Sequence, residues 1–265
     1  LFSVVLFTSQ VFAQQSLEFG LNYGFSSYLG DLQPKEFTFN RSDFAVGVQG
    51  RYNFNSRITG RIAANYGRIS GSDRESGDAD LINRNLSFRS SIIEMAFIGE
   101  INILNFGIHK ENRSNKKYYK FTPYVYGGIN IFRFNPQANY NNRWYDLQPL
   151  GTEGQGVPLS GKDRYSLTQI GIPMGLGIKY QFKPNIILSF EIGWRKTFTD
   201  YLDDVSTVYY DKDVLGDQFG DAAFYLADPN LGDNPLWTTT GEQRGDPNQK
   251  DAFLYANFIV TRNIT

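Results

Sequence analysis

The sequence contains no cysteine, a single histidine and no run of 18 apolar residues. The absence of cysteine excludes a disulfide framework, a thiolate metal site, a cysteine nucleophile and a lipid anchor attached through cysteine. A transmembrane helix needs about 20 consecutive apolar residues, so helical membrane spans are excluded as well. The net charge of −1 provides no global field for nucleic acid, and we therefore expect no nucleic-acid partner.

Aromatic residues and glycine are abundant, with 17 Tyr, 22 Phe and 26 Gly among 265 residues. Aromatic side chains favour strands and glycine favours tight turns, so the composition favours an all-β fold. The N-terminal residues 1–7 are apolar except for Ser3, and Val11-Phe12-Ala13 fits a small-residue cleavage site. We expect residues 1–13 to be part of a signal peptide and 14–265 to form the mature fold, with a buried strand as the alternative for 1–13.

The dominant pattern from residue 16 onward is an alternation with a period of two residues, which is typical of strands with two different faces. In 17–25, Leu17, Phe19, Leu21, Tyr23 and Phe25 alternate with small or polar residues. The same alternation recurs along most of the chain, although its last segment is too weakly patterned for its faces to be assigned. The predicted strands cover 17–25, 44–54, 58–66, 93–103, 121–134, 166–182, 186–195 and 251–262.

The connections between these eight strands differ in length. Short links occupy 55–57 and 183–185, and 105–119 is intermediate; long polar links occupy 28–42, 70–86, 135–164 and 200–250. Short periplasmic turns and long extracellular loops are typical of bacterial outer-membrane barrels, whose termini both lie in the periplasm. Aromatic residues also flank the short turns, as in an interfacial girdle: Tyr52, Phe54, Tyr180 and Phe182. The sequence thus predicts an eight-stranded antiparallel transmembrane β-barrel in the outer membrane.

Alternation alone does not separate a membrane barrel from a soluble sandwich or a lipocalin-like barrel, which keep apolar side chains inside. Three observations favour the membrane barrel: the strands are long, a signal sequence precedes them, and their polar face is charged and rich in glycine. The charged residues on that face are Arg51, Arg61, Glu94, Glu100, Lys179, Glu191 and Arg195. They could line an ion path, but opposite charges paired inside a narrow, filled lumen are the favoured interpretation.

The chain has few residues suited to catalysis, and we expect neither an enzyme, a cofactor nor a small-molecule substrate. The single histidine, His109, falls in the intermediate turn, away from the rim where barrel enzymes carry histidine sites. The 200–251 segment is strongly acidic and could bind calcium, but its spacing matches no EF-hand loop, so a solvated loop is favoured over a calcium site, with protein contact left open. The turn at 105–120 is basic, and Lys110, Arg113, Lys116 and Lys117 are candidate partner-binding residues, with a solvated turn as the alternative.

Several strings together resemble the PorG-like family of outer-membrane barrels of Bacteroidota, a resemblance that covers nearly the whole mature chain. The most specific string is Asp200-Tyr201-Leu202-Asp203-Asp204-Val205-Ser206. The others are Tyr28-Leu29-Gly30-Asp31-Leu32, Pro123-Tyr124-Val125-Tyr126-Gly127-Gly128-Ile129, Phe132-Arg133-Phe134-Asn135-Pro136, Gly193-Trp194-Arg195-Lys196-Thr197-Phe198-Thr199, Tyr209 to Asp211 and Arg244-Gly245-Asp246-Pro247.

The resemblance implies a role in type IX protein secretion, in contact with the periplasmic ring of the lipoprotein PorK and of PorN. An eight-stranded barrel has no lumen for a polypeptide, so this role would be that of a structural adaptor or anchor in outer-membrane lipid. The alternative is a small OmpA/OmpX-like barrel with a loop-based binding role unrelated to secretion. A third possibility, an enzyme acting on lipid A, is nearly excluded by the histidine count.

Overall fold

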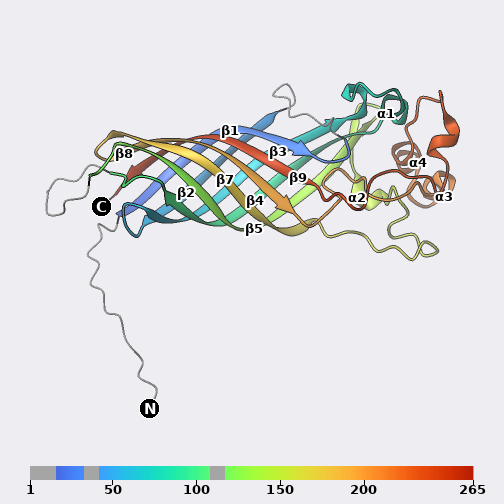
Figure 1. The fold of residues 1–265 in the computed structure, drawn as a ribbon. Coiled ribbons are helices and arrows are strands. Elements are labelled where there is room, and N and C mark those ends of the chain that lie inside the picture. The colour runs from blue at the N-terminus through green and yellow to red at the C-terminus, as the bar shows by residue number, and fades with distance from the viewer. Residues whose placement is uncertain (1–15, 33–41, 108–116, 265) are drawn as a thin grey trace, which may run out of the picture.

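The computed structural model describes residues 16–32, 42–107 and 117–264, and in this part of the chain eight strands close into an antiparallel barrel (Figure 1). The strand order is β1-β2-β3-β4-β5-β7-β8-β9, and β9 pairs with β1 to close the barrel. The predicted signal peptide, 1–13, lies outside the described residues. The strands are β1 (Ser16–Leu29), β2 (Asp43–Asn53), β3 (Ile58–Ser72), β4 (Ser87–Asn102), β5 (Phe121–Tyr140), β6 (Arg143–Asp146), β7 (Thr168–Lys183), β8 (Ile186–Thr197) and β9 (Ala252–Asn263).

The two ends of the barrel differ, as the link lengths predict. At one end, tight turns join β2 to β3 and β7 to β8, and the first and last described residues lie at this same end (Figure 1). The β2–β3 turn is stabilised locally because Asn55 Oδ1 accepts hydrogen bonds from the backbone N–H groups of Arg57 and Ile58 at 2.8 and 2.9 Å. We call this the short-turn end and the opposite one the long-loop end.

A folded cap covers the long-loop end (Figure 1). β5 extends beyond the predicted 121–134 to Tyr140 and forms a hairpin with β6 through Asn141 and Asn142, whose positive φ angles of 50° and 60° suit a two-residue hairpin turn. No helix of the described residues is long and apolar enough to cross a membrane. The helices are α1 (Ala79–Arg84), α2 (Leu147–Leu150), α3 (Lys212–Phe219) and α4 (Asp221–Ala227), with 3-10 helices η2 (Asp73–Glu75) and η3 (Pro235–Thr238).

The outer face of the barrel is an apolar belt and the inner face is polar, which decides between the membrane and soluble interpretations. Ile62 and Leu176 are 56% and 64% exposed on the outside, whereas Arg51 and Glu100 are buried inside. A soluble barrel has the reverse arrangement. The aromatic residues predicted to flank the short turns are also exposed there: Tyr52, Phe54, Tyr180 and Phe182. The fold is therefore a transmembrane β-barrel of the outer-membrane type.

We expect a cation in the centre of the belt to destabilise the barrel. Ile62→Arg places a charge in hydrocarbon and should lower the free energy of unfolding by roughly 2–4 kcal/mol, measured by denaturant titration in lipid bilayers. The control is Leu159→Arg, because Leu159 lies in a loop at the long-loop end and is 94% exposed. Equal effects of the two substitutions would contradict a lipid-facing position for Ile62.

Candidate functional site

The lumen is held by a carboxylate that faces three cations from three other strands. Glu100 of β4 lies 3.2 Å from Arg51 Nε, 3.1 Å from Arg61 Nε and 2.5 Å from Lys179 Nζ. All four side chains are almost completely buried. Because β2, β3 and β7 each supply one cation, the ion pairs connect opposite walls of the barrel through its interior.

A second part of the network lies beside it. Arg61 also donates to Glu191 at 2.8 Å, and the Tyr124 hydroxyl donates to the same carboxylate at 3.0 Å. Farther toward the long-loop end, Arg195 lies 3.3 Å from Glu94, which also accepts hydrogen bonds from two asparagine side chains. Charges in a low-dielectric interior are tolerated when they are paired, and Arg61 and Arg195 each have a carboxylate partner here.

The lumen charges balance among the described residues. The buried cations are Arg51, Arg61, Lys179 and Arg195, and the buried carboxylates are Glu18, Glu94, Glu100 and Glu191. Four positive charges against four negative ones leave no net charge to attract a permeating ion. The predicted pairing of opposite charges inside a filled lumen is confirmed, and the arrangement is suited to a plug rather than a path.

The cap has a charged core of its own. Glu153, between β6 and β7, accepts hydrogen bonds from the backbone N–H groups of Ser206 and Thr207 and from Arg244 at 3.1 Å. Arg244 also donates to the Asp204 carbonyl at 2.6 Å. These contacts tie the 147–167 segment to the long 198–251 segment.

A second ion pair extends this core to the β3–β4 link. Arg84 of α1 forms a bidentate pair with Asp73 of η2, with both N···O distances at 2.7 Å. The Arg84 guanidinium also donates to the Arg244 carbonyl at 2.7 Å and to the Asp31 carbonyl at 3.3 Å. Every long link with described residues therefore contributes to one hydrogen-bonded cap.

A phenol lies between two buried carboxyl groups where the cap meets the barrel wall. The Tyr28 hydroxyl oxygen is 2.6 Å from Asp203 Oδ2 and 2.9 Å from Asp251 Oδ1. A phenol has a single proton and can donate to only one of them, so the other contact needs a proton on a carboxyl group. Burial, reinforced by the charge of Asp31, raises the pKa of Asp203 well above its usual 3.8. Burial, reinforced by Asp203, does the same to the pKa of Asp251.

The pKa of Asp204 is also raised, although its hydrogen-bond partners differ from those of Asp203 and Asp251. Asp204 accepts hydrogen bonds from the hydroxyl groups of Thr152 and Tyr165, both at 2.5 Å. Burial raises the pKa of Asp204 to about 6, although Arg244 and these two hydroxyl groups oppose the rise.

The interpretation of 200–251 as a solvated acidic loop is wrong for its two ends. Asp200, Asp203, Asp204 and Asp251 are all buried, while most acidic residues between them are exposed. The strings that carry the family resemblance meet here, because Tyr28 contacts Asp203 and the backbone N–H of Asp246 donates to Asp31 at 3.0 Å. Sequence reasoning missed this cluster because its members are far apart in the chain and carry no shared spacing.

The predicted partner-binding residues stay a prediction, because only Lys117 of the four is among the described residues. Lys110, Arg113, Lys116 and the histidine His109 lie outside the described residues. Lys117 is described and exposed, with its Nζ 5.3 Å from the centre of the Tyr119 ring. No group of three or more acidic or histidine side chains in the described part of the chain has a geometry that could hold a metal ion.

Comparison with protein families gives one match. The model of DUF6089, described as a domain of unknown function, matches residues 1–223. The chain belongs to this family. A comparison with curated proteins finds no match.

Solved structures similar to this member of the DUF6089 family include outer-membrane proteins. Neisserial surface protein A is 10% identical, with a TM-score of 0.42 over 93% of this chain and 96% of that one. A major outer membrane protein of Thermus thermophilus is 11% identical, with a TM-score of 0.43 over 94% of this chain and 99% of that one. OprG of Pseudomonas aeruginosa is 10% identical, with a TM-score of 0.40 over 95% of this chain and 98% of that one.

We expect Glu100 to be the most sensitive position in the lumen. Glu100→Gln leaves Arg51, Arg61 and Lys179 around a neutral amide, and breaking a buried ion pair from one side costs about 3–5 kcal/mol. The free energy of unfolding in bilayers measures this loss. The matched control is Glu191→Gln, which should cost less because Arg61 still contacts Glu100. An equal loss for the two variants would show that the convergence on Glu100 is not what stabilises the lumen.

We expect the cap to be tightest in acid. The raised pKa values of Asp203 and Asp251 mean that their protonated forms favour the folded cap. That contribution is complete below the usual Asp pKa of 3.8 and is lost as the pH rises through the raised values. Limited proteolysis of the cap should therefore be faster at about pH 8 than at about pH 5. For each carboxyl group that loses its proton, the fraction of molecules with an open cap should rise by up to about tenfold per pH unit.

The Asp203→Asn variant separates this effect from general changes with pH. Its side chain stays neutral throughout, so proteolysis of the cap should depend less on pH than in the original protein. The exposed Asp163→Asn serves as the control and should keep the original pH dependence. Faster cleavage in acid than at neutral pH would reverse the predicted sign.

Proposed function

We propose that the protein is a structural adaptor in type IX secretion, and neither an enzyme nor a conduit. The observation that carries this proposal is the lumen filled by paired charges around Glu100. A barrel of eight strands is just wide enough to be filled by its own side chains, so a polypeptide has no room to pass. A part in secretion must then depend on the surfaces at the two ends of the barrel.

The proposed orientation places the short-turn end and both termini in the periplasm. Bacterial outer-membrane barrels have short periplasmic turns and long extracellular loops, and the unequal ends of this barrel follow that pattern. The 105–119 link is the longest connection at the short-turn end. In the proposal its cations, Lys110, Arg113, Lys116 and Lys117, dock an acidic patch of the ring that PorK and PorN form, as the family resemblance implies.

The test is affinity purification from detergent-solubilised outer membranes, together with export of type IX cargo. Changing Lys110, Arg113, Lys116 and Lys117 to Glu should reduce co-purification of PorK and PorN and impair export, because charge pairing at an interface rim is reversed. The barrel should remain folded, since an exposed turn contributes little to stability. Raising the salt concentration should weaken the original contact.

Two controls make the outcome specific. Changing the exposed cations Arg143 and Lys250 of the cap to Glu makes the opposite end of the barrel more negative and should leave export intact. A Lys117→Cys variant should react with an impermeant maleimide only after the outer membrane is opened. Intact export after deletion of the whole protein would refute the adaptor role. If deletion blocks export but the four-Glu variant does not, the adaptor role stands and only the assignment of the 105–119 link as the docking site is refuted.

The second candidate function is binding at the long-loop end, unrelated to secretion. The observation that favours it is a folded cap with large apolar side chains on its surface, including Leu159, Leu231 and Leu236. Large apolar side chains that are exposed on a folded, water-facing cap are available for contact with a partner. This candidate predicts that deletion leaves type IX export unchanged, so the export assay separates the two functions.

A further inference from the structure

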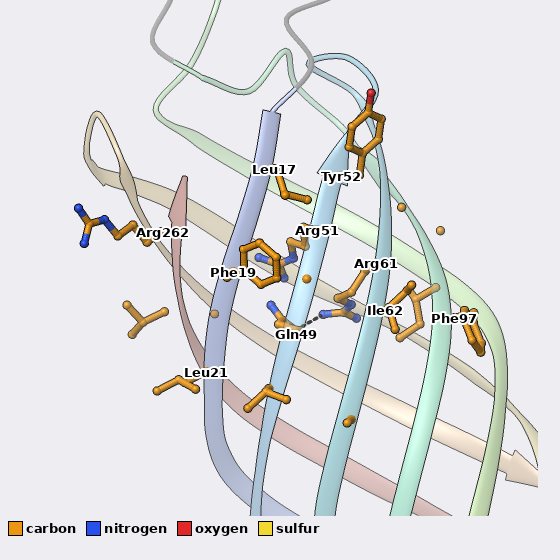
Figure 2. A pocket seen from close by; sticks show the side chains of 18 residues that line it. Leu17, Phe19, Leu21, Gln49, Arg51, Tyr52, Arg61, Ile62, Phe97 and Arg262 are labelled. Atoms are coloured by element: carbon orange, nitrogen blue, oxygen red, sulfur yellow. Dashed lines mark hydrogen bonds between the residues drawn. The ribbon is translucent and has the colours of Figure 1, made fainter. Parts of the chain in front are cut away.

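A broad hollow interrupts the apolar belt on one side of the barrel. It crosses the outer faces of β9, β1, β2, β3 and β4 and has a volume of about 1260 Å³. Figure 2 shows Leu17, Phe19, Tyr52 and Ile62 around it. Ligand pockets typically measure about 300–1,000 Å³, so this hollow is large enough for a long, flexible molecule.

The hollow exists because glycine replaces large residues at outward-facing positions. Gly50, Gly60 and Gly99 occupy places where the alternation of β2, β3 and β4 would put an apolar side chain. Gly60 and Gly99 are direct partners across neighbouring strands. On the other side of the barrel, Met174 and Trp194 fill the corresponding cross-strand positions and are exposed.

The glycines at the hollow are not required by close packing at two of the three positions. A Cβ atom added to Gly99 would meet its nearest neighbour at 3.8 Å, and one added to Gly50 would meet the Phe19 ring at 3.6 Å. Both values are ordinary van der Waals distances. Larger side chains therefore fit the backbone there, and the hollow is a feature of the outer surface rather than a steric necessity of the barrel.

A cation lies at one end of the hollow. Arg262 of β9 is exposed, lines the hollow and pairs directly with Phe19, which in turn pairs with Gly50. Arg262 is one residue from the end of β9 at the short-turn end, where lipid headgroups meet the belt. Long basic side chains at this depth reach the membrane interface, where phosphate groups are available.

We propose that the hollow binds one phospholipid of the surrounding bilayer, with an acyl chain over Gly50, Gly60 and Gly99 and the phosphate on Arg262. Apolar surfaces in a membrane gain little from the hydrophobic effect, so association depends on close van der Waals contact. A hollow forfeits such contacts unless a flexible chain fills it. The walls supply apolar contacts, and Arg262 supplies the charge complementary to a phosphodiester.

A second copy of this chain suits the hollow less well. In a two-fold dimer the same surface patch faces itself, so two copies meeting here place a hollow against a hollow. The bilayer itself supplies acyl chains at high local concentration on this face. These considerations favour a lipid as the occupant, and the oligomeric state becomes an outcome of the test.

The experiment uses the purified barrel reconstituted with phosphatidylglycerol that carries a photoreactive group on one acyl chain. We expect crosslinks concentrated at the strand segments around Gly50, Gly60 and Gly99, and native mass spectrometry to find one retained phospholipid per barrel. The double variant Gly50→Leu, Gly99→Leu fills the hollow and should lower retention by about tenfold, equivalent to about 1.4 kcal/mol.

Matched variants control for altered lipid contact in general. Gly127→Leu adds the same side chain at the next position in the row of Gly60 and Gly99, where a Cβ has 3.9 Å of room, and should keep the lipid. Arg262→Gln should weaken retention, whereas Arg57→Gln in an exposed short turn should not. All variants should keep the heat-modified gel mobility of a folded barrel.

Four results would overturn the proposal. Crosslinks spread evenly around the belt would mean that only ordinary boundary lipid contacts the protein. Unchanged retention of phospholipid in the double glycine variant would show that no acyl chain occupies the hollow. Unchanged retention in Arg262→Gln would show that Arg262 does not bind the phosphate. A dimer that the double glycine variant converts to monomer would assign the hollow to a second copy of the chain.

Discussion

The structure depends on the neutralisation of charge inside a closed barrel. The inner face of an eight-stranded barrel is narrow and largely shielded from water, so each cation that points inward needs a carboxylate within ion-pair distance. Glu100 meets this requirement for Arg51, Arg61 and Lys179 at once. Because these residues come from four different strands, the pairing requires all four strands to be in register. The charges thereby fix the register and fill the lumen at the same time.

Buried charges are also neutralised in the cap at the long-loop end, but not all of them by ion pairs. Arg244 and Arg84 are paired with Glu153 and Asp73, whereas the carboxyl groups of Asp203 and Asp251 share the Tyr28 phenol and each accept one backbone N–H hydrogen bond. Charge is balanced there by protons rather than by cations. The paired charges make the lumen insensitive to moderate changes of pH, whereas the cap is held in part by groups that titrate.

The barrel could be predicted from the sequence and the cap could not. Alternation with a period of two is a local property that places Ile62 and Glu100 on opposite faces, and the charged, glycine-rich character of the polar face then indicates which face lines the lumen. The closure of the cap instead depends on contacts such as Tyr28 with Asp251, which are 223 positions apart and follow no period. An acidic loop gives no local sign of which carboxylates will be buried. For that reason the sequence predicts solvated side chains for Asp203 and Asp204, whereas both lie in the core of the cap.

The most direct test of the filled lumen is the conductance of the purified barrel in planar lipid bilayers. With the lumen occupied by the balanced pairs around Glu100, insertion should produce no stable conductance steps at neutral pH and moderate voltage, even when circular dichroism shows a fully folded barrel. Reproducible ohmic steps that scale with the number of inserted barrels would show an open lumen and contradict the account.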